Sequence, residues 1–324
     1  MPLVPVLLVG LSGCVFVSAN LNPFGGNIEP LAERKVAGEG KDKVLLVDIT
    51  RTITADEQPG SFGFKRQEST VARLESELQQ AGEDERVKAI VLRINSPGGT
   101  VTASDVIYHR LMAFKAEHHV PVIAHFGDMA TSGAYYVALA ADEIVASPTS
   151  VTGSIGVILF GLNVKGLMSK LGVTDQTIKS GVHKDIGSPL RKMTPEEEEI
   201  MQRVLDDMRN RFVGLVRERR PQFDGTASYI DGRILTASQA LDGKLVDRIG
   251  YLDDAIATAR RRAQLDQASV VMYRRPGEFA ESIYSKPVVG SGATQVNLNL
   301  LNIDLGGLLP GGPRFMYLWQ PDAE

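Results

Sequence analysis

The chain has 324 residues, of which 43% are hydrophobic and 23% charged, and its net charge is −4. This composition is typical of a globular protein with one large domain or two small ones. The basic residues are scattered, which argues against a nucleic-acid partner, since such a partner needs a basic face. A single cysteine excludes an internal disulfide, and no zinc-type Cys/His spacing occurs, so we expect neither a metal nor a cofactor.

The first 28 residues contain no charged side chain. Their apolar run at 3–19 has the length of a signal-peptide core or a short membrane span. It includes "LSGC", residues 11–14, which resembles a bacterial lipobox, where cleavage leaves the cysteine as a lipidated N-terminus. Three interpretations stay open: lipidation at Cys14, an uncleaved anchor, or a buried strand. The first two predict a chain attached to the cell membrane, with its body on the extracytoplasmic side.

Residues 29–42 are polar and contain glycine, so we interpret them as a linker. From residue 43 onward, apolar runs alternate with helical patterns, which is typical of parallel βαβ units. The runs "KVLLVDIT", "KAIVLRINS", "PVIAHFG" and "EIVAS" predict strands at 43–50, 88–96, 121–127 and 143–147. Helices are predicted between them, at 69–84, 102–117 and 133–142.

Two helical regions follow later in the chain. At 194–221, Thr194 fits an N-cap, Pro195 the first helical position and Glu197 the third position of a capping box. We interpret the run of four glutamates there as a solvated helix start and not as a metal site. A buried stripe is expected at residues 200, 204, 208, 212 and 215. The pattern at 236–263 predicts helix-turn-helix, with Gly243 as a C-cap.

Ser132 lies in "TSGA", between the predicted strand at 121–127 and a helix of small residues. A lone serine at a helix start is most often a cap. Here, however, Gly133 follows directly, and "SPGG", which ends in Gly98 and Gly99, occupies the same place after the preceding strand. Glycines let the backbone approach a ligand closely, and their N–H groups can stabilise an oxyanion. The pattern favours an acyl-transfer site with Ser132 as its nucleophile.

The base that would activate this serine is not fixed by spacing. The five histidines do not exclude a His–Asp relay, although none of them lies between 126 and 182. A lysine is the other option, and it must be desolvated to accept a proton at neutral pH. The candidates for such a lysine are Lys165, Lys170, Lys179, Lys184 and Lys192.

A combination of motifs resembles the signal peptide peptidase A family in its short form. The matching segments are "NSPGG", "TSGAYYVALAAD", "TGSIGV", "KSGVHKDIGSPLRKMTPEE" and "GRILTASQALDGKLVDRIG", and the resemblance covers roughly residues 43–265. It implies an α/β fold of the Clp protease/crotonase type, a spiral of ββα units. In this chain the C-terminal helices and an extended tail would follow. It also implies that Ser132 is the nucleophile, Lys184 the general base and Ser154 a hydrogen-bond partner of that lysine. Gly99 and Gly133, with Gly98 beside them, would form the oxyanion and substrate-binding site.

The resemblance further implies a serine endopeptidase that degrades remnant signal peptides and other apolar peptides at the membrane. It implies a homo-oligomeric ring in which neighbouring subunits share each site. Two other functions stay open on the same fold: a crotonase-type acyl-CoA enzyme and a non-catalytic membrane scaffold. We expect the peptidase domain at 43–282 and a Gly/Leu-rich tail at 283–324. The match after residue 265 is poor, and the segment "LLPGGPRFMYLW" has no assigned role.

Overall fold

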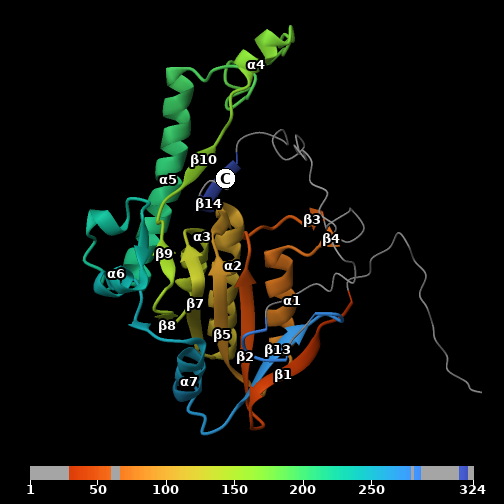
Figure 1. Cartoon of the computed structure of the whole chain (residues 1–324), viewed down its shortest axis with the longest axis vertical. Helices are drawn as coiled ribbons and strands as arrows, with labels where there is room; N and C mark the ends of the chain where they lie inside the picture. Colours follow the sequence, from red (N-terminus) through yellow and green to blue (C-terminus); the bar gives the residue numbers. More distant parts are fainter. Residues whose placement is uncertain (1–28, 60–65, 279–280, 286–313, 320–324) are drawn as a thin grey trace, which may run out of the picture.

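The computed structural model describes residues 29–59, 66–278, 281–285 and 314–319. Residues 1–28, including Cys14, and most of the expected tail lie outside these ranges. The centre of the molecule is a sheet in the order β1-β13-β2-β5-β7-β8-β12, with β9 beside β7 and β11 beside β9 (Figure 1). Its strands are β1 (Ala32–Gly38), β2 (Lys43–Thr50), β5 (Val87–Ser96), β7 (Val122–Thr131), β8 (Glu143–Ala146), β9 (Val151–Gly153), β11 (Ile234–Thr236), β12 (Arg248–Ile249) and β13 (Ser269–Arg274).

The central strands are parallel and buried on both faces. β2 pairs with β5 and β5 pairs with β7, in registers that place Leu45 opposite Ile90 and Ile90 opposite Val122. Side chains alternate between the two faces, so Leu45 and its neighbour Val44 belong to separate apolar cores. A strand that buries both faces reads as a continuous apolar run, and this explains the sequence "KVLLVDIT".

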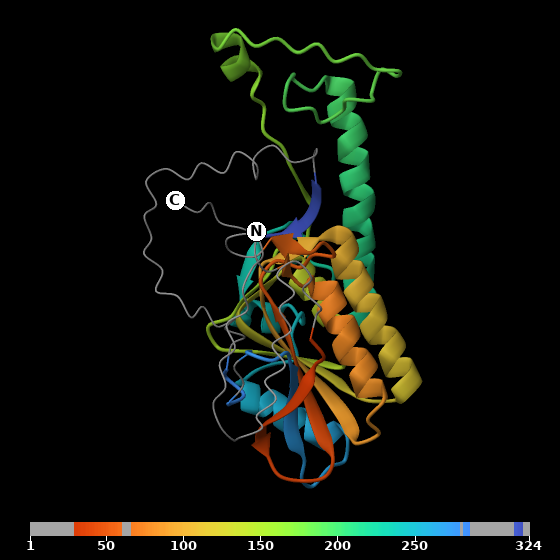
Figure 2. The ribbon, with the colours of Figure 1, turned by 90° about the vertical axis from the view of Figure 1, so that its right-hand side faces the viewer.

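Helices cover both faces of the sheet (Figure 2). The larger core lies under α1 (Thr70–Gly82), α2 (Val101–His118), α3 (Gly133–Ala138) and the C-terminal half of α5 (Pro195–Arg219). The smaller core lies under α7 (Leu252–Arg262). The remaining elements are short: β3 (Gln58–Pro59), β4 (Arg66–Gln67), β6 (Gly98–Thr100), β10 (Ile158–Phe160), α4 (Lys165–Lys170), a 3₁₀ turn (Ala227–Tyr229), α6 (Ala237–Asp242) and β14 (Arg314–Leu318).

The predicted strands and helices before residue 150 are all present, within a few residues of their expected ends. Local chemistry explains these ends, since the Ser69 hydroxyl caps α1 by accepting from the amide of Ala72. The capping box of α5 is also confirmed, because Thr194 accepts from the amide of Glu197 and Glu197 accepts from the amide of Thr194. Gly243 ends α6 as predicted.

The expectation of a linker at 29–42 is wrong for most of that segment. Residues Ala32–Gly38 form β1, which pairs antiparallel with β13 at the edge of the sheet. Polar residues had suggested a linker, but an edge strand exposes one face and therefore tolerates them. Val36 and Ala37 still pack against the smaller core.

Residues 161–194, here called the arm, stand beyond the end of the sheet together with the start of α5 (Figures 1 and 2). None of the arm's residues is buried within the described chain. Several of its large apolar side chains are well exposed, among them Leu171, Ile178 and Val182, at 70%, 99% and 74%.

The apolar stripe expected along α5 is only partly buried. Phe212 is buried, but Ile200, Val204, Met208 and Leu215 are half-buried. The reason is geometric, because the N-terminal half of this 25-residue helix rises past the sheet toward the arm. The expectation of a solvated glutamate run also needs a correction, since Glu197 is buried at 2% exposure.

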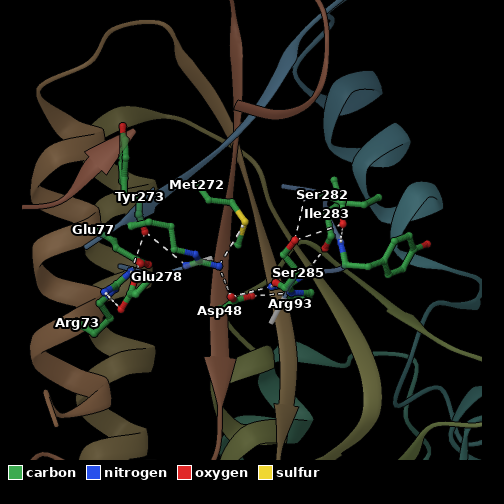
Figure 3. Close-up of polar contacts among 12 residues, drawn as sticks. Asp48, Arg73, Glu77, Arg93, Met272, Tyr273, Glu278, Ser282, Ile283 and Ser285 are labelled. Carbon is green, nitrogen blue, oxygen red and sulfur yellow. Dashed lines mark hydrogen bonds and ion pairs between the residues drawn. The ribbon is translucent and has the colours of Figure 1, made fainter. Parts of the chain in front are cut away.

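A buried ionic network ties the end of the domain to its sheet (Figure 3). Asp48 on β2 accepts from Arg93 on β5 at 2.6 Å and from Arg274 on β13 at 2.5 Å. Arg93 also donates to the carbonyl oxygens of Ile283 and Ser285, the latter at 2.7 Å. Because Arg93 satisfies its donors on both sides, the segment at 281–285 is fixed against the sheet.

Candidate active site

Ser132 lies at the junction between β7 and α3, where the backbone is strained. Its φ is 53° and its ψ is −116°, a conformation that residues with a side chain rarely adopt. Its side chain makes no capping hydrogen bond to α3, so the helix-cap interpretation does not hold. The turn is held by its backbone, because the amide of Ser132 donates to the Gly153 carbonyl at 2.8 Å and its carbonyl accepts from Tyr136 at 2.9 Å.

The backbone amides of Gly99 and Gly133 lie close to each other beside this turn. A Cβ atom added to Gly133 would lie 3.1 Å from the amide nitrogen of Gly99, and one added to Gly98 would lie 2.8 Å from that of Gly133. At both positions the added carbon would also crowd other atoms, so the site admits only glycine. The glycine motifs therefore bring two backbone amides close together, and their role as oxyanion donors stays a prediction.

Ile53 sets the direction of the Gly99 amide. The Ile53 amide donates to the Gly98 carbonyl at 2.7 Å, and the Ile53 carbonyl accepts from the Thr100 amide at 2.9 Å. Since these two bonds occupy the side of β6 that faces Ile53, the Gly99 N–H is directed to the other side. No motif marked Ile53; only its place in the apolar pattern after β2 could have suggested burial.

Ser154 follows β9, which pairs in parallel with β7 so that Gly153 lies opposite Thr131. Ser154 is buried, has a φ of 51°, and donates its amide to the Arg233 carbonyl at 2.7 Å. Ser132, Ser154 and the three glycines of the predicted site therefore lie on adjoining segments of one chain.

Lys184 lies on the arm and is exposed. Figures 1 and 2 show the loop between α4 and α5 well away from α3, at whose start Ser132 lies. The single chain does not bring Lys184 to Ser132. The residue after it, Asp185, is held by Arg191 and by Lys179, at 2.7 Å each.

Residues 314–318, to which the sequence assigned no role, form a strand beside the glycines. β14 lies between β6 and β10, with Tyr317 opposite Gly99. The Tyr317 ring is fully buried, with its centroid 5.3 Å from that of Tyr136 and 4.8 Å from that of Phe212. Its hydroxyl donates to the Met208 carbonyl at 2.9 Å. The apolar run "RFMYLW" was the sequence signal for this strand.

Two models of protein families match parts of this chain. The model of peptidase family S49 matches residues 114–266, and that of Clp protease matches residues 64–151. The chain is 35% identical over 252 residues to the putative signal peptide peptidase SppA of Enterococcus faecium, which covers 78% of this chain and 72% of the relative. The chain belongs to peptidase family S49. It is a serine peptidase of the signal peptide peptidase A type, and the predicted family and enzyme class are confirmed.

Two further proteins are similar to this chain. The putative protease slr0021 of Synechocystis is 41% identical over 189 residues, which is 58% of this chain and 68% of that protein. A mutant of the 1510-N membrane-bound stomatin-specific protease overlaps 68% of this chain and 85% of its own, with 17% identity and a TM-score of 0.42. The predicted mixed α/β fold of the Clp protease/crotonase type is confirmed for this S49 chain.

None of the helices in the described ranges combines the length and hydropathy of a membrane-spanning segment. The uncharged leader and Cys14 lie outside the described residues, so lipidation stays a prediction.

The strained turn predicts an unusual order of stability among Ser132 variants. Ser132→Gly and Ser132→Ala both remove the hydroxyl, but only glycine relieves the positive φ. We expect the glycine variant to be the more stable by about 1 kcal/mol or more. Urea denaturation of the two proteins measures the difference. In the matched pair at Ser76, inside α1, alanine should be the more stable variant. The same order at both positions would contradict strain at Ser132.

Proposed function

We propose that this S49 peptidase is an endopeptidase with a Ser132/Lys184 dyad. Its substrates are remnant signal peptides and other apolar peptides at the membrane. The observation that carries the proposal is the strained, uncapped Ser132 beside the neighbouring amides of Gly99 and Gly133. A nucleophile next to two fixed N–H donors is the arrangement that acyl transfer requires.

In the proposed reaction, Lys184 accepts the proton of Ser132 as the Ser132 Oγ attacks the peptide carbonyl. Once β14 has left β6, the amides of Gly99 and Gly133 stabilise the oxyanion of the tetrahedral intermediate. The amine of the leaving peptide takes the proton, and water then hydrolyses the acyl-serine. Ser154 orients the lysine through its hydroxyl.

The proposal includes a ring in which one subunit supplies the serine and its neighbour the lysine. Lys184 is exposed in the single chain, whereas a lysine that acts as a base needs a site from which water is excluded. The apolar side chains of the arm are exposed beside it, and contact with a second copy would cover them. Heterologous contacts of this kind close into rings.

Labelling with a fluorophosphonate tests the peptidase assignment. We expect a covalent adduct at Ser132, located by mass spectrometry, together with hydrolysis of an apolar fluorogenic peptide. Ser132→Ala should lose both, and Ser76→Ala on α1 should keep both. Peptide hydrolysis that survives in Ser132→Ala would refute the assignment. Thioester turnover by an unlabelled chain would instead favour the acyl-CoA enzyme. The absence of both activities would favour the scaffold.

Mixing two inactive variants tests the shared site. After reversible dissociation, equal amounts of Ser132→Ala and Lys184→Ala should reassemble at random. A site is intact where one variant supplies lysine and its neighbour supplies serine, so about a quarter of the sites should recover activity. If each subunit holds its own dyad, mixing restores nothing. Subunit exchange is confirmed independently with two fluorescent labels.

We further propose that the N-terminus attaches the enzyme to the membrane through a lipid on Cys14, with the catalytic domain on the extracytoplasmic side. The support is the uncharged run that ends in "LSGC". We expect the purified membrane form to begin at Cys14 and to carry the mass of the lipid. In Cys14→Ser both features should disappear. An unchanged mass and membrane retention in that variant would indicate an uncleaved anchor instead.

A further inference from the structure

The loop that carries Lys184 has no apolar core to hold it. No side chain of the arm is buried in the described chain, so packing does not set the position of this loop. The backbone bonds around Lys184 are local, for example that from its own amide to the Gly181 carbonyl at 3.1 Å. A more distant attachment must fix the loop relative to the rest of the molecule.

Arg191 provides such an attachment. Its guanidinium binds Asp185 through Nε and Nη2, both at 2.7 Å, and binds Glu197 through Nη1 at 2.7 Å and Nη2 at 2.5 Å. Nη1 also donates to the Lys192 carbonyl at 3.2 Å. An arginine has five N–H donors in a rigid fork, so this side chain is fully used.

The two carboxylates connect the loop to α5. Asp185 is the immediate neighbour of Lys184, whereas Glu197 belongs to the first turn of α5 and also accepts from the Thr194 amide at 2.9 Å. Glu197 and Asp185 have low exposure, with 2% and 14% of their side chains accessible. The hydrogen bonds from Arg191 are the largest cause that lowers the pKa of each, to about 2 for Glu197, so both stay ionised across the neutral range.

The opposite half of α5 is packed on the serine side of the molecule. Phe212 lies 5.0 Å from Tyr136 of α3, measured between ring centroids. Arg211 pairs with Asp105 of α2 at 2.6 Å, and the Tyr136 hydroxyl donates to the same carboxylate at 2.5 Å. Since α5 is one continuous helix, it connects Phe212 in the packed core to Glu197 beside the Lys184 loop across about 22 Å.

We propose that Arg191, with Asp185 and Glu197, is the positioning element that fixes the Lys184 loop on the end of α5, so that the lysine reaches Ser132 in the correct geometry. This inference rests on the proposed function, in which Lys184 is the base. In this proposal Arg191 acts through its bonds to Asp185, the neighbour of Lys184, and not by contact with the reacting atoms. A displacement of about 1 Å at a reacting group can reduce turnover about a hundredfold.

The alternative role is purely structural: the ion pairs would stabilise the arm without any effect on the geometry of catalysis. The arginine variant distinguishes the two. In Arg191→Lys the positive charge remains, but a single ammonium group cannot bind both carboxylates in a bidentate manner. If Arg191 acts by position, kcat falls while the subunit stays folded and assembled.

The experiment compares Arg191→Lys with Arg203→Lys, since Arg203 lies on α5 and pairs with Glu199 at 3.0 Å on an exposed surface. For Arg191→Lys we expect kcat on an apolar fluorogenic peptide to fall about tenfold to a hundredfold. KM should stay within about twofold, since Ser132 and the glycines beside it are unchanged. The pH–rate profile of kcat should shift, and the rate of fluorophosphonate labelling at Ser132 should fall in parallel. Arg203→Lys should change none of these.

A second variant keeps the test decisive if Arg191→Lys does not fold. Glu197→Gln retains an oxygen that can accept from the Thr194 amide, and therefore the helix cap, but it weakens the bond to Arg191; we expect the same pattern with a smaller loss of kcat. Light scattering and urea unfolding report assembly and stability.

The inference is overturned if kcat falls only in proportion to the folded, assembled fraction, or if Arg191→Lys and Glu197→Gln behave like Arg203→Lys. If Lys184→Ala is inactive while both variants are normal, the proposed role of Arg191 is wrong and the Ser132/Lys184 dyad stands. If Lys184→Ala is active, the proposed dyad itself fails.

Discussion

The hydrogen bond from the Ser132 amide to the Gly153 carbonyl, 2.8 Å long, is the constraint on which the site depends. It holds β9 beside the end of β7 and so places Ser154 next to the turn. It also stabilises the Ser132 backbone in a conformation that costs energy in a residue with a side chain. The strained turn lies between a buried strand and a buried helix, and both of these pack in the larger core.

Much of this arrangement could be predicted from the sequence, because local chemistry determined it. The apolar runs, the Ser69 cap and the Thr194–Glu197 capping box each act within a few residues, and each has the expected form. The glycines beside Ser132 were informative for the same reason, since a backbone that must approach another backbone admits no side chain. The family resemblance then supplied the fold, which periodicity alone had limited to parallel βαβ units.

The features that escaped prediction depend on residues far apart in the chain. β1 was interpreted as a linker because its partner, β13, follows more than 200 residues later. Nothing in the sequence paired Asp48 with Arg93 and Arg274 (Figure 3). Nor did it show that one glutamate of four at the start of α5 would be buried. Polar residues read as solvated in a local window, and only the tertiary structure shows which of them find partners. For Lys184, even the tertiary structure of one chain does not show a partner at the site, because the arm that carries it is exposed and lies away from Ser132.

β14 has a thermodynamic consequence for any peptide that pairs with β6 at the glycines. Ile53 occupies one side of β6 and β14 occupies the other, and one side of a strand can pair with only one neighbour. An incoming peptide can therefore pair with β6 only after β14 has dissociated from it and the buried Tyr317 ring has left its site. The dissociation constant of the peptide measured on the whole chain equals its intrinsic dissociation constant divided by the fraction of molecules in which β14 has left β6. Each interaction that retains Tyr317, including the bond from its hydroxyl to Met208, lowers that fraction and weakens the apparent affinity for substrate.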